Sequence, residues 1–577
     1  MKKILGIILA VSMLFGMTAT AEGVTAQGTA ISPIGGEVVV EVTADANTIY
    51  DVKVISHNET PSIGGPAAES VPADMVEYNT LAVDDVTNAT LTSVAIREAA
   101  KNALIEAGID PTPFEVKKEQ AGDTERTAEE LSCDVLIIGA GGAGLTAAVK
   151  AAQEGANVIV LEQMAFVGGN TLKATGGMNA ASTHLQAAAG ITDSTVETFI
   201  EDTMNGGHQK NDLALVTTMA ENSAEAIAWL EEIGAPLPKI APTGGTTHKY
   251  LHEPEDGSAV GNFLVEKMMA VCDQLNIKPM TNTEATELLV EDGKVVGAVA
   301  HDKKHDYTIR AGAVIVATGG FGANFDLMCS YDPSLNGAVT TNHSGADGDG
   351  IILATAIGAD TVDMDQIQLH PTVHQETSML ITESLRSAGA ILINADGVRF
   401  TNDMSTRDAV SQAELKQPGS FAWIIFDQRI VDHQKSTAKY INGGLTVTAD
   451  TYEGLAEQMG VDPAAFAASM EKWNAAVAAG VDEEFGRNNG IDEDLSQAPY
   501  YAIKVSPGIH HTMGGLKIDT DTHVINTEGS IIDGLFAAGE VTGGVHGGNR
   551  IGGNAVCDIV VFGRIAGTNA AAYALGK

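Results

Sequence analysis

Cysteine is scarce in this chain. Four cysteines stand among 577 residues, and no two of them form a C-x-x-C or C-x-x-C-H pattern. The sequence therefore excludes a c-type haem module and argues against a cysteine-ligated iron–sulfur cluster, so we expect a protein without haem. Spacing does not decide whether Cys133, Cys272, Cys329 and Cys557 form disulfides, and we expect free, buried thiols.

Positive charge is scarce as well. The chain has 33 lysines and arginines against 75 aspartates and glutamates, which gives a formal net charge of −42. No basic surface can then be widespread, so the sequence argues against binding of nucleic acids or anionic membranes. We interpret the acidic excess as a solvated surface, and we predict no metal site.

Long apolar runs are confined to the N-terminus, and no later segment looks able to span a membrane. The start, MKKILGIILAVSMLFGMTATA, has two lysines, an apolar run and an Ala-x-Ala site. This pattern predicts a secretory signal peptide over residues 1–21 and export to the cell surface, the extracellular space or the periplasm. A retained anchor is the alternative, but it needs about 20 apolar residues.

What the chain does have is glycine, at 63 positions, and a hydrophobic fraction of 44%, which together with its length predict two to four packed domains. Two β-rich runs in GEVVVEVTADANTIYDVKVISHNET begin a small unit. The segment TSVAIREAAKNALIEAGI follows with helical spacing of Val94, Ile96, Ala99, Ala103 and Leu104. We predict an α+β domain over residues 22–110 and a charged, proline-containing linker over residues 111–130.

A dinucleotide-binding fingerprint opens the larger body. Residues 134–138 are predicted as a buried strand, 144–154 as a helix and 157–161 as a second strand. The first turn carries glycines in G-x-G-x-x-G order, and Glu162 follows the third of them by 18 residues. The glycines let a pyrophosphate approach the helix N-terminus, and the acid binds a ribose hydroxyl. This context predicts a Rossmann-like α/β fold.

Further glycine-rich segments indicate which dinucleotide is bound. GGNTLKATGGMNA follows Glu162 closely, another buried strand ends at Thr318, and Glu540 precedes a glycine-rich entry into a helix. A nucleotide held by segments from the whole chain favours permanently bound FAD over exchangeable NAD.

These segments together resemble the FAD-binding flavoproteins of the fumarate reductase and succinate dehydrogenase family, above all the soluble, exported fumarate reductases. The likeness runs in order from residue 133 to the C-terminus through IIGAGGAGLTAA, GGNTLKATGGMNA, HPT, ITESLRSAGAILIN, FTNDMSTRDAVS, HHTMGG and AAGEVTGGVHGGNRIGGNA. It implies an FAD-binding domain in two parts, residues 131–364 and 509–577, interrupted by a mobile α+β clamp domain over residues 365–508. It also implies non-covalent FAD held by Gly139, Gly141, Gly142, Ala143, Gly144, Glu162, Gly169, Asn170, Thr171, Thr175, Gly176, Gly177, Thr318, Asp349, His511, Glu540, Asn554, Ala555 and Val556.

The N-terminal unit resembles small domains that carry covalent FMN. Its matching segments are HNET at 57–60 and DDVTNATLTS at 84–93, where the likeness implies that a flavin transferase attaches FMN to Thr90. Asp85, Thr87 and Ala89 also match, but Asn88 replaces a glycine of the pattern. Asparagine tolerates a left-handed backbone, so the turn can survive. The alternative is that Thr90 or its neighbour Thr92 simply caps the helix that follows.

The resemblance also assigns two ends of a substrate site. In HGGNRIGGN it makes Arg550 the bidentate clamp for one carboxylate, assisted by His510. It places the other carboxylate against His370, Thr382 and Glu383. Without the resemblance, His370 would be an ordinary loop histidine, and His511 a core residue.

A proton donor is implied as well. The likeness makes Arg407 the acid, fed by Glu383 and Arg386, because hydride addition to a polarised double bond leaves a carbanion to protonate. Otherwise Glu383 and Arg386 would form an exposed helical ion pair, and Arg407 would pair with Asp408 at the surface.

The function implied is an exported, anaerobic-respiration type of reductase. It would transfer hydride from FAD to fumarate, giving succinate, with electrons from an unidentified membrane or extracellular donor passing through FMN. The alternatives are the same chemistry on urocanate, methacrylate or an aryl-acrylate, and a non-catalytic flavin electron carrier. Mixing the reduced protein with fumarate separates the carrier from the enzymes.

Overall fold

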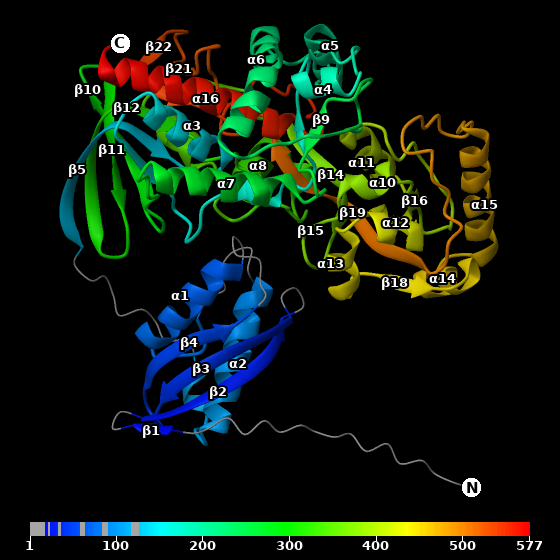
Figure 1. The fold of residues 1–577 in the computed structure, drawn as a ribbon, viewed down its shortest axis with the longest axis horizontal. Helices are drawn as coiled ribbons and strands as arrows, with labels where there is room; N and C mark the ends of the chain where they lie inside the picture. Colours follow the sequence, from blue (N-terminus) through cyan, green and yellow to red (C-terminus); the bar gives the residue numbers. More distant parts are fainter. Residues whose placement is uncertain (1–17, 21–22, 33–35, 58–63, 84–89, 117–125) are drawn as a thin grey trace. The chain divides into compact units, whose positions relative to one another are not determined.

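The computed structural model describes residues 18–20, 23–32, 36–57, 64–83, 90–116 and 126–577 (Figure 1). The chain separates into two compact units, residues 1–123 and 124–577, and each is described by itself. All four cysteines are free. Cys272 and Cys557 are buried as expected, whereas Cys133 and Cys329 are half-buried.

The first unit is an antiparallel sheet packed against two helices. Its strands pair in the order β1 (Thr18–Thr20), β2 (Gly23–Ser32), β3 (Gly36–Ala44) and β4 (Ile49–Ser56), and its helices are α1 (Gly64–Glu77), α2 (Thr90–Glu106) and the single turn η1 (Thr112–Phe114). Alternate residues of β3, including Val40 and Val42, are buried in a core shared with Ile96 of α2. α2 passes β2 so closely that a Cβ on Gly28 would lie 2.2 Å from the carbonyl oxygen of Ala99.

The sequence predicted β3, β4 and α2 but missed β2 and α1. Its apolar face for α2 is wrong at Val94, which is 40% exposed while Ile96 is fully buried. Side chains two positions apart on a helix point about 200° away from each other, so Val94 and Ile96 cannot lie on the same face. The predicted linker has regular structure at both ends, since Phe114 is buried in the first core and strand β5 begins at Thr127.

The second unit begins with the predicted dinucleotide-binding topology. Parallel β5 (Thr127–Ile138) lies between β6 (Val158–Leu161) and β12 (His305–Val316), and the other edge of β12 pairs first with antiparallel β11 (Lys294–His301) and then with parallel β22 (Ile531–Ala537). β10 (Glu284–Glu291) and β21 (His523–Ile525) complete the sheet. The ends of β5 and β12 that enter the site are buried runs, as strands covered on both faces require.

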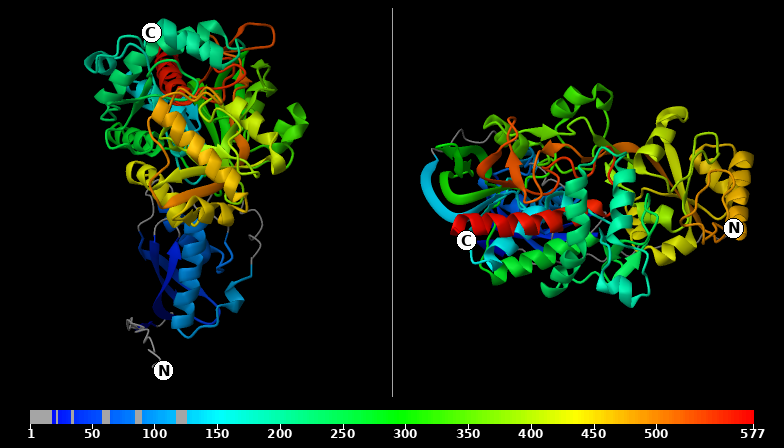
Figure 2. Two further views of the ribbon diagram at one scale, coloured as in Figure 1. Left: turned by 90° about the vertical axis from the view of Figure 1, so that its right-hand side faces the viewer. Right: turned by 90° about the horizontal axis from the view of Figure 1, so that it is seen from above.

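Helices cover this sheet (Figure 2). α3 (Gly142–Gln153) follows β5 and packs against α16 (Asn554–Leu575) and α7 (Val260–Gln274). We call this part the sheet domain. Its other elements are η2 (Gly169–Lys173), β7 (Met178–Asn179), α4 (His184–Ala188), α5 (Val196–Gly206), α6 (Leu213–Glu232), β8 (Lys239–Ala241), β9 (Leu251–Glu253), α8 (Phe325–Tyr331), η3 (Pro333–Leu335), α9 (Asp349–Ala356), β13 (Thr361–Val362) and β20 (Gly515–Leu516).

The expectation that no segment after the N-terminus is apolar enough to span a membrane is wrong for α16. Among the described residues this 22-residue helix has the length and composition to cross a bilayer, with a mean hydropathy of 1.3. In an 18-residue apolar window of this helix, 67% of the residues are buried within the unit, against α3 and the sheet. Its apolar composition is therefore that of a central core helix.

The remaining residues form a second sheet with its own core, which we call the clamp. The strand order is β15 (Met379–Leu380), β14 (Ile367–His374), β19 (Tyr500–Thr512), β17 (Ala422–Asp427) and β16 (Ile391–Ile393), with β18 (Val447–Ala449) also on β19. Its helices are α10 (Glu383–Ser387), α11 (Arg407–Leu415), η4 (Pro418–Ser420), α12 (Gln428–His433), α13 (Thr437–Asn442), α14 (Tyr452–Met459) and α15 (Pro463–Ala479). Phe426, Phe466 and Trp473 are buried in this core.

Strand β19 joins the clamp to the sheet domain. Its first half pairs with β17, and its second half pairs with β14 as far as Thr512. His510 and His511 lie near the end of this strand, so these two histidines and the clamp core share one continuous piece of backbone (β19 in Figure 1).

Candidate active site

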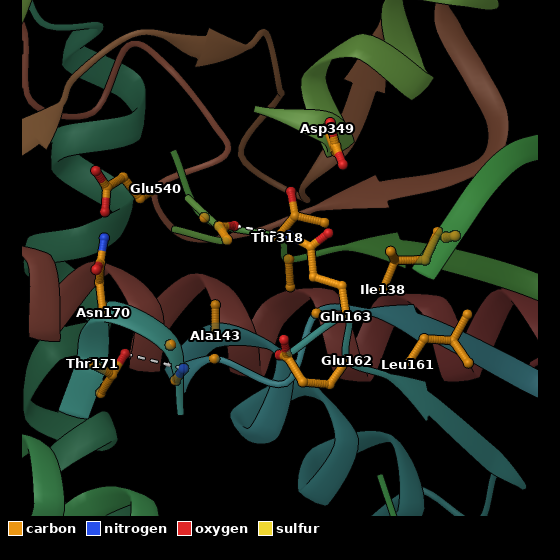
Figure 3. Close-up of a pocket in the computed structure, with 18 of the residues that line it drawn as sticks. Ile138, Ala143, Leu161, Glu162, Gln163, Asn170, Thr171, Thr318, Asp349 and Glu540 are labelled. Carbon is orange, nitrogen blue, oxygen red and sulfur yellow. Dashed lines mark hydrogen bonds between the residues drawn. The ribbon is translucent and has the colours of Figure 1, made fainter. Parts of the chain in front are cut away.

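A pocket lies where the first turn of the dinucleotide fold meets the C-terminal segments (Figure 3). Gly139 has φ +103°, and a Cβ there would lie 2.4 Å from the carbonyl oxygen of Ala317. A Cβ on Gly144 would lie 1.9 Å from the carbonyl oxygen of Gly139, whereas at Gly141 it would meet nothing within 4 Å. The outer glycines therefore allow close packing, and the middle one leaves the turn open toward the pocket.

Glu162 lies at the end of β6, facing this pocket (Figure 3). Its carboxylate accepts hydrogen bonds from the backbone N–H groups of Ala140 (2.9 Å) and Met164 (2.8 Å). Burial raises its pKa to about 7, against the lowering effect of these two bonds. The acid thus holds the glycine turn and also presents its carboxyl group to a ligand.

Most of the residues predicted to hold the cofactor line the pocket. They are Gly139, Gly141, Gly142, Ala143, Glu162, Gly169, Asn170, Thr171, Thr318, Asp349 and Glu540. The others do not line it: Gly144 packs inside α3, Thr175, Gly176 and Gly177 connect η2 to β7, His511 is on β19, and Asn554, Ala555 and Val556 form the first turn of α16.

Sequence reasoning missed several lining residues, among them Gln163, Thr283, Glu284, His343 and Gly345. His343 and Gly345 stand in the glycine-containing segment before Asp349, which was a usable signal. Thr283 and Glu284 reach the pocket because Met280 and Thr283 bond to the backbone around Glu162, a tertiary contact without a local pattern.

Two observations suit FAD, one at a residue that lines the pocket and one at a residue in contact with the lining. Two buried atoms have no hydrogen-bond partner among the described residues: the hydroxyl of Thr318 and Nε2 of His511. Each is therefore free to form a hydrogen bond with a ligand. The carboxylate of Glu540 is 3.3 Å from Nδ1 of His511 and accepts a hydrogen bond from the backbone N–H of Thr512. Burial raises its pKa, but His511 and that N–H lower it to about 2, so it is ionised.

A second group of polar residues lies between the sheet domain and the clamp. Arg407, the first residue of α11, donates from Nε (3.0 Å) and Nη2 (2.9 Å) to the same oxygen of Glu383, the first residue of α10. Burial raises the pKa of Glu383, but the charges of Arg407 and Arg386 outweigh it and lower the pKa, so Glu383 is a carboxylate. The surface pair of Arg407 with Asp408 does not form, because Asp408 contacts His208 at 2.8 Å.

Gln368 joins the two arginines of the site and was missed by sequence reasoning. Its side-chain oxygen accepts from Nη1 of Arg407 (3.3 Å), and its amide donates to the carbonyl oxygen of Arg550 (2.7 Å) and to Asn549 (2.8 Å). It stands two residues before His370 on β14, so both side chains lie on the same face of that strand. Its position two residues before His370 was the sequence feature that could have indicated Gln368.

Arg550 is buried without a carboxylate partner. It is 5% exposed, donates from Nη1 to the carbonyl oxygen of Ile551 (3.1 Å), and its Nε has no partner within the described parts of the chain. Burial, together with the charge of Arg407, lowers its pKa to about 9, so it is a cation at neutral pH. A buried guanidinium in this state is a receptor for an anion.

Two imidazoles lie near these arginines. The rings of His370 and His510 are 5.1 Å apart, and Nδ1 of His510 is 2.8 Å from the hydroxyl of Thr341. His370 is a fully buried residue of β14 and not a loop residue, and its Nε2 has no described partner. Burial and the charge of Arg407 hold both pKa values well below the ordinary range, so both rings are neutral.

Thr382 and Arg386 complete the set. Thr382 caps α10, and its hydroxyl lies 3.1 Å from that of Thr175 in the sheet domain. Arg386 is 1% exposed and donates from Nη1 to the carbonyl oxygen of Asp403. The exposed helical pair with Glu383 is therefore absent: Arg386 is buried, Glu383 is half-buried, and the carboxylate of Glu383 pairs with Arg407.

Thr90, the predicted FMN site, is the first residue of α2. Asp85, Thr87, Asn88 and Ala89, which make up the rest of that pattern, lie outside the described residues. The position of Thr90 at the start of α2 agrees with its interpretation as a residue that begins the helix. Flavin attachment to Thr90 remains a prediction.

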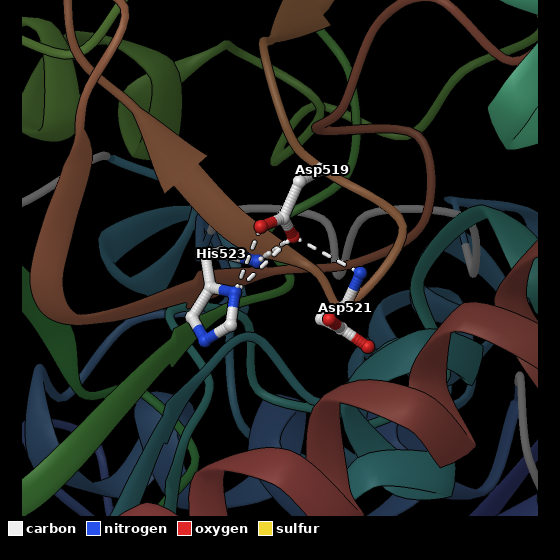
Figure 4. Close-up of side chains that lie close together, drawn as sticks. All are labelled: Asp519, Asp521 and His523. Carbon is white, nitrogen blue, oxygen red and sulfur yellow. Dashed lines mark hydrogen bonds and ion pairs between the residues drawn. The ribbon is translucent and has the colours of Figure 1, made fainter.

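Asp519, Asp521 and His523 lie close enough together to suggest a metal site (Figure 4). The carboxylate of Asp519, however, accepts the backbone N–H groups of Asp521 (3.0 Å) and His523 (2.9 Å) and lies 2.9 Å from His523 Nδ1. These contacts are those of a tight turn before β21, and we assign no metal to it.

Comparisons with known proteins agree with this geometry. The family model of the FAD binding domain matches residues 134–556, and that of the FMN-binding domain matches residues 34–105. The NADH:fumarate oxidoreductase of Klebsiella pneumoniae is 42% identical over 94% of this chain, which spans 58% of that relative's length. The urocanate reductase of Eggerthella lenta is 34% identical over 96% of this chain and 94% of its own. The solved open conformation of a flavocytochrome c3 fumarate reductase covers 81% of this chain and 85% of its own with a TM-score of 0.67 and 43% identity.

Proposed function

The chain belongs to the fumarate reductase-type family of FAD-binding oxidoreductases, in a form with an FMN-binding domain, and on this premise we propose that it reduces fumarate to succinate. The observation that carries this proposal is Arg550, a buried guanidinium without a carboxylate partner among the described residues. Gln368 links the backbone carbonyl oxygen of Arg550 to the guanidinium of a second, half-buried arginine, Arg407. Such a site calls for an anionic substrate.

Two sets of donors suit the two carboxylates of fumarate. Arg550 with His510 forms one set. His370, whose Nε2 is buried and unpartnered, forms the other with the hydroxyl of Thr382. Because the imidazoles are neutral, they donate hydrogen bonds without adding charge, and the arginines supply the electrostatic attraction.

FAD in the pocket of Figure 3 would supply a hydride from its reduced ring. The glycine turn and Glu162 would hold its diphosphate and ribose, and His511 and Thr318 would contact the remainder through their free polar atoms. The residues predicted from the first turn of α16, Asn554 to Val556, would complete the cradle at a helix N-terminus.

In this proposal Arg407 protonates the substrate. Hydride addition to one carbon of the double bond leaves an electron pair on the other, and that carbon takes a proton from the Arg407 guanidinium. Glu383, bonded to Arg407 through Nε and Nη2, returns the proton after receiving one from Arg386. The product gains one hydride and one proton. Arg386 is left without the proton that it passed to Glu383 and must regain one before the next turnover.

Electrons would reach the site through FMN attached to Thr90 by a phosphoester, made by a flavin transferase. The signal-like N-terminus supports export of the chain to the cell surface, the extracellular space or the periplasm, where a membrane or extracellular donor would reduce it. Both statements rest on sequence pattern and on the match of the FMN-binding domain over residues 34–105.

A screen of unsaturated acids tests the proposal. The purified holoprotein is reduced with a viologen and offered fumarate, urocanate, methacrylate or cinnamate, and re-oxidation is followed. We expect fumarate to give the highest kcat/KM. A preference for urocanate, the substrate named for one relative, would support the reductase chemistry but reject fumarate as the substrate. If no acid re-oxidised the protein, the function as a non-catalytic electron carrier would be favoured.

A further inference from the structure

A buried carboxyl group outside the proposed catalytic set lies in the clamp. Glu414 is in the last turn of α11, seven residues after Arg407, so the two side chains leave one face of the helix two turns apart. Glu414 is fully buried, and neither carboxyl oxygen has a hydrogen-bond partner in the described segments. Burying a carboxyl group without a hydrogen-bond partner costs free energy of folding, so we expect Glu414 to have a role beyond packing.

The proposed proton path ends at a residue that solvent does not reach. Arg386 is 1% exposed, and its Nε and Nη2 are buried without a partner in the described part of the chain. Once Arg386 has passed a proton to Glu383, it must regain one. An ionisable group therefore has to stand behind it.

Three carboxyl groups act on the charge of Arg386, namely Glu383, Asp403 and Glu414. Glu383 is committed to its pair with Arg407. Asp403 is committed as well, because its carboxylate accepts a backbone N–H and hydrogen bonds from two other arginines. Glu414 is the uncommitted member of the three.

The protonation state of Glu414 suits a proton source. Burial raises its pKa well above the ordinary value, against the positive charge of Arg386 on α10. The backbone N–H of Ala422 on β17 opposes this rise. Burial without a hydrogen-bond partner favours the neutral carboxyl group, and the adjacent Leu415, 38% exposed, shows that this end of α11 reaches the surface.

We propose that Glu414 is a positioning residue of the proton supply, which returns a proton to Arg386 through one bridging water molecule. The inference rests on the proposed path from Arg386 through Glu383 to Arg407. In each turnover Arg407 gives one proton to the substrate carbon, each residue behind it passes one forward, and Glu414 takes one from solvent at the end of α11. No electron moves in these steps.

The variant Glu414→Gln keeps the shape of the side chain and cannot release a proton. With reduced viologen and fumarate, we expect kcat to fall about tenfold or more and KM to stay within about twofold, since removing a proton carrier slows turnover and not binding. The solvent deuterium isotope effect on kcat should rise. Glu414→Asp should recover part of the rate, and the exposed clamp variant Glu471→Gln should behave as the wild type.

Unchanged kcat and isotope effect in Glu414→Gln would overturn the inference, and so would equal losses in Gln and Asp accompanied by a raised KM and a lower Tm. The infrared spectrum of the wild type minus that of Glu414→Gln should show the C=O band of one protonated carboxyl group, and the wild type minus Glu471→Gln should not, which tests the protonation state apart from turnover. Arg407→Ala is measured alongside. If it turns over normally, the proposed path itself fails; if it is inactive while Glu414→Gln is normal, only the role of Glu414 fails.

Discussion

At the scale of single residues, the site depends on arginines that are held in place by the carboxylate of Glu383 and the side-chain amide of Gln368. Arg407 is oriented by two hydrogen bonds to Glu383 and one to Gln368, and Arg550 by its own loop and by Gln368. A positioned guanidinium binds an anion and also stabilises the charge that develops on it, so losing one should affect turnover more than binding.

Arg407→Ala should leave fumarate binding within a few-fold of the wild type and lower kcat by about 10³-fold, because acid and electrostatic support are both lost. Arg407→Lys should recover part of the rate. Steady-state kinetics with reduced viologen measures both, and Arg429→Ala, which removes a surface ion-pair arginine of the clamp, is the matched control. Wild-type turnover in Arg407→Ala would move the acid role to His510 or to water.

His370 should discriminate between substrates by their number of carboxylates. Its unpartnered Nε2 donates to the second carboxylate, so His370→Ala should lower kcat/KM for fumarate by about tenfold to a hundredfold, as expected for one lost buried contact. Methacrylate, with one carboxylate, should change by less than about threefold. His374→Ala on the same strand is the control. Equal losses for both acids would refute the assignment of two carboxylate ends.

Residue identity was predictable where a motif names it, and contacts were not. Arg407, Glu383 and Arg550 stand in recognisable segments, and the structure brings them into one group. Gln368 was missed because its partners, Asn549 and Arg550, lie more than 180 residues away and leave no local periodicity. Glu414 was missed because no motif includes it and its burial is produced by neighbouring elements.

At the scale of elements, the clamp is fixed by a buried ionic cluster. The carboxylate of Asp403, itself unexposed, binds the guanidiniums of Arg399 (2.8 Å) and Arg487 (3.3 Å), and both guanidiniums lie over the ring of Trp473. The carbonyl oxygen of the same residue receives Arg386. One aspartate thus ties the helix of the proton path to the core of the clamp.

Asp403→Asn should therefore destabilise the clamp by about 3–5 kcal/mol, the cost of removing one partner from a buried charge cluster. Urea unfolding followed by fluorescence reports it, because two of the chain's three tryptophans, Trp423 and Trp473, belong to the clamp. Asp492→Asn, at an exposed position, should leave the transition unchanged. A stable Asp403→Asn variant would show that the cluster is held by packing alone.

Element types were easier to predict than element surroundings. The strands and helix of the dinucleotide fold followed from buried runs and glycine spacing. The buried face of α2 was predicted wrongly at Val94, and the apolar helix α16 was overlooked. The local sequence of a segment does not show which neighbouring elements will bury it.

At the scale of the whole molecule, two flavins in two separate units should be separable. We expect denatured wild-type protein to retain one flavin, bound to Thr90, and Thr90→Ala to retain none while native FAD binding persists. Mass spectrometry of the intact chain and flavin fluorescence after denaturation measure this. Viologen-driven fumarate reduction should largely survive in Thr90→Ala, since a small donor can reduce FAD directly.

Thr92→Ala, two residues further along α2, is the matched control and should keep its covalent flavin. Denatured wild type without flavin would contradict the assignment of FMN to Thr90 and favour its interpretation as a helix-starting residue.

The continuity of β19 also limits how this molecule can change through evolution. A single residue inserted or deleted between Tyr500 and Val505, where β19 pairs with β17 without a register shift, would turn the two halves of the strand to opposite faces. Either the clamp core would lose its inward side chains, or His510 would lose its place beside His370 and Thr341. Lineages that keep both must therefore keep the length of this strand, whatever happens to its sequence.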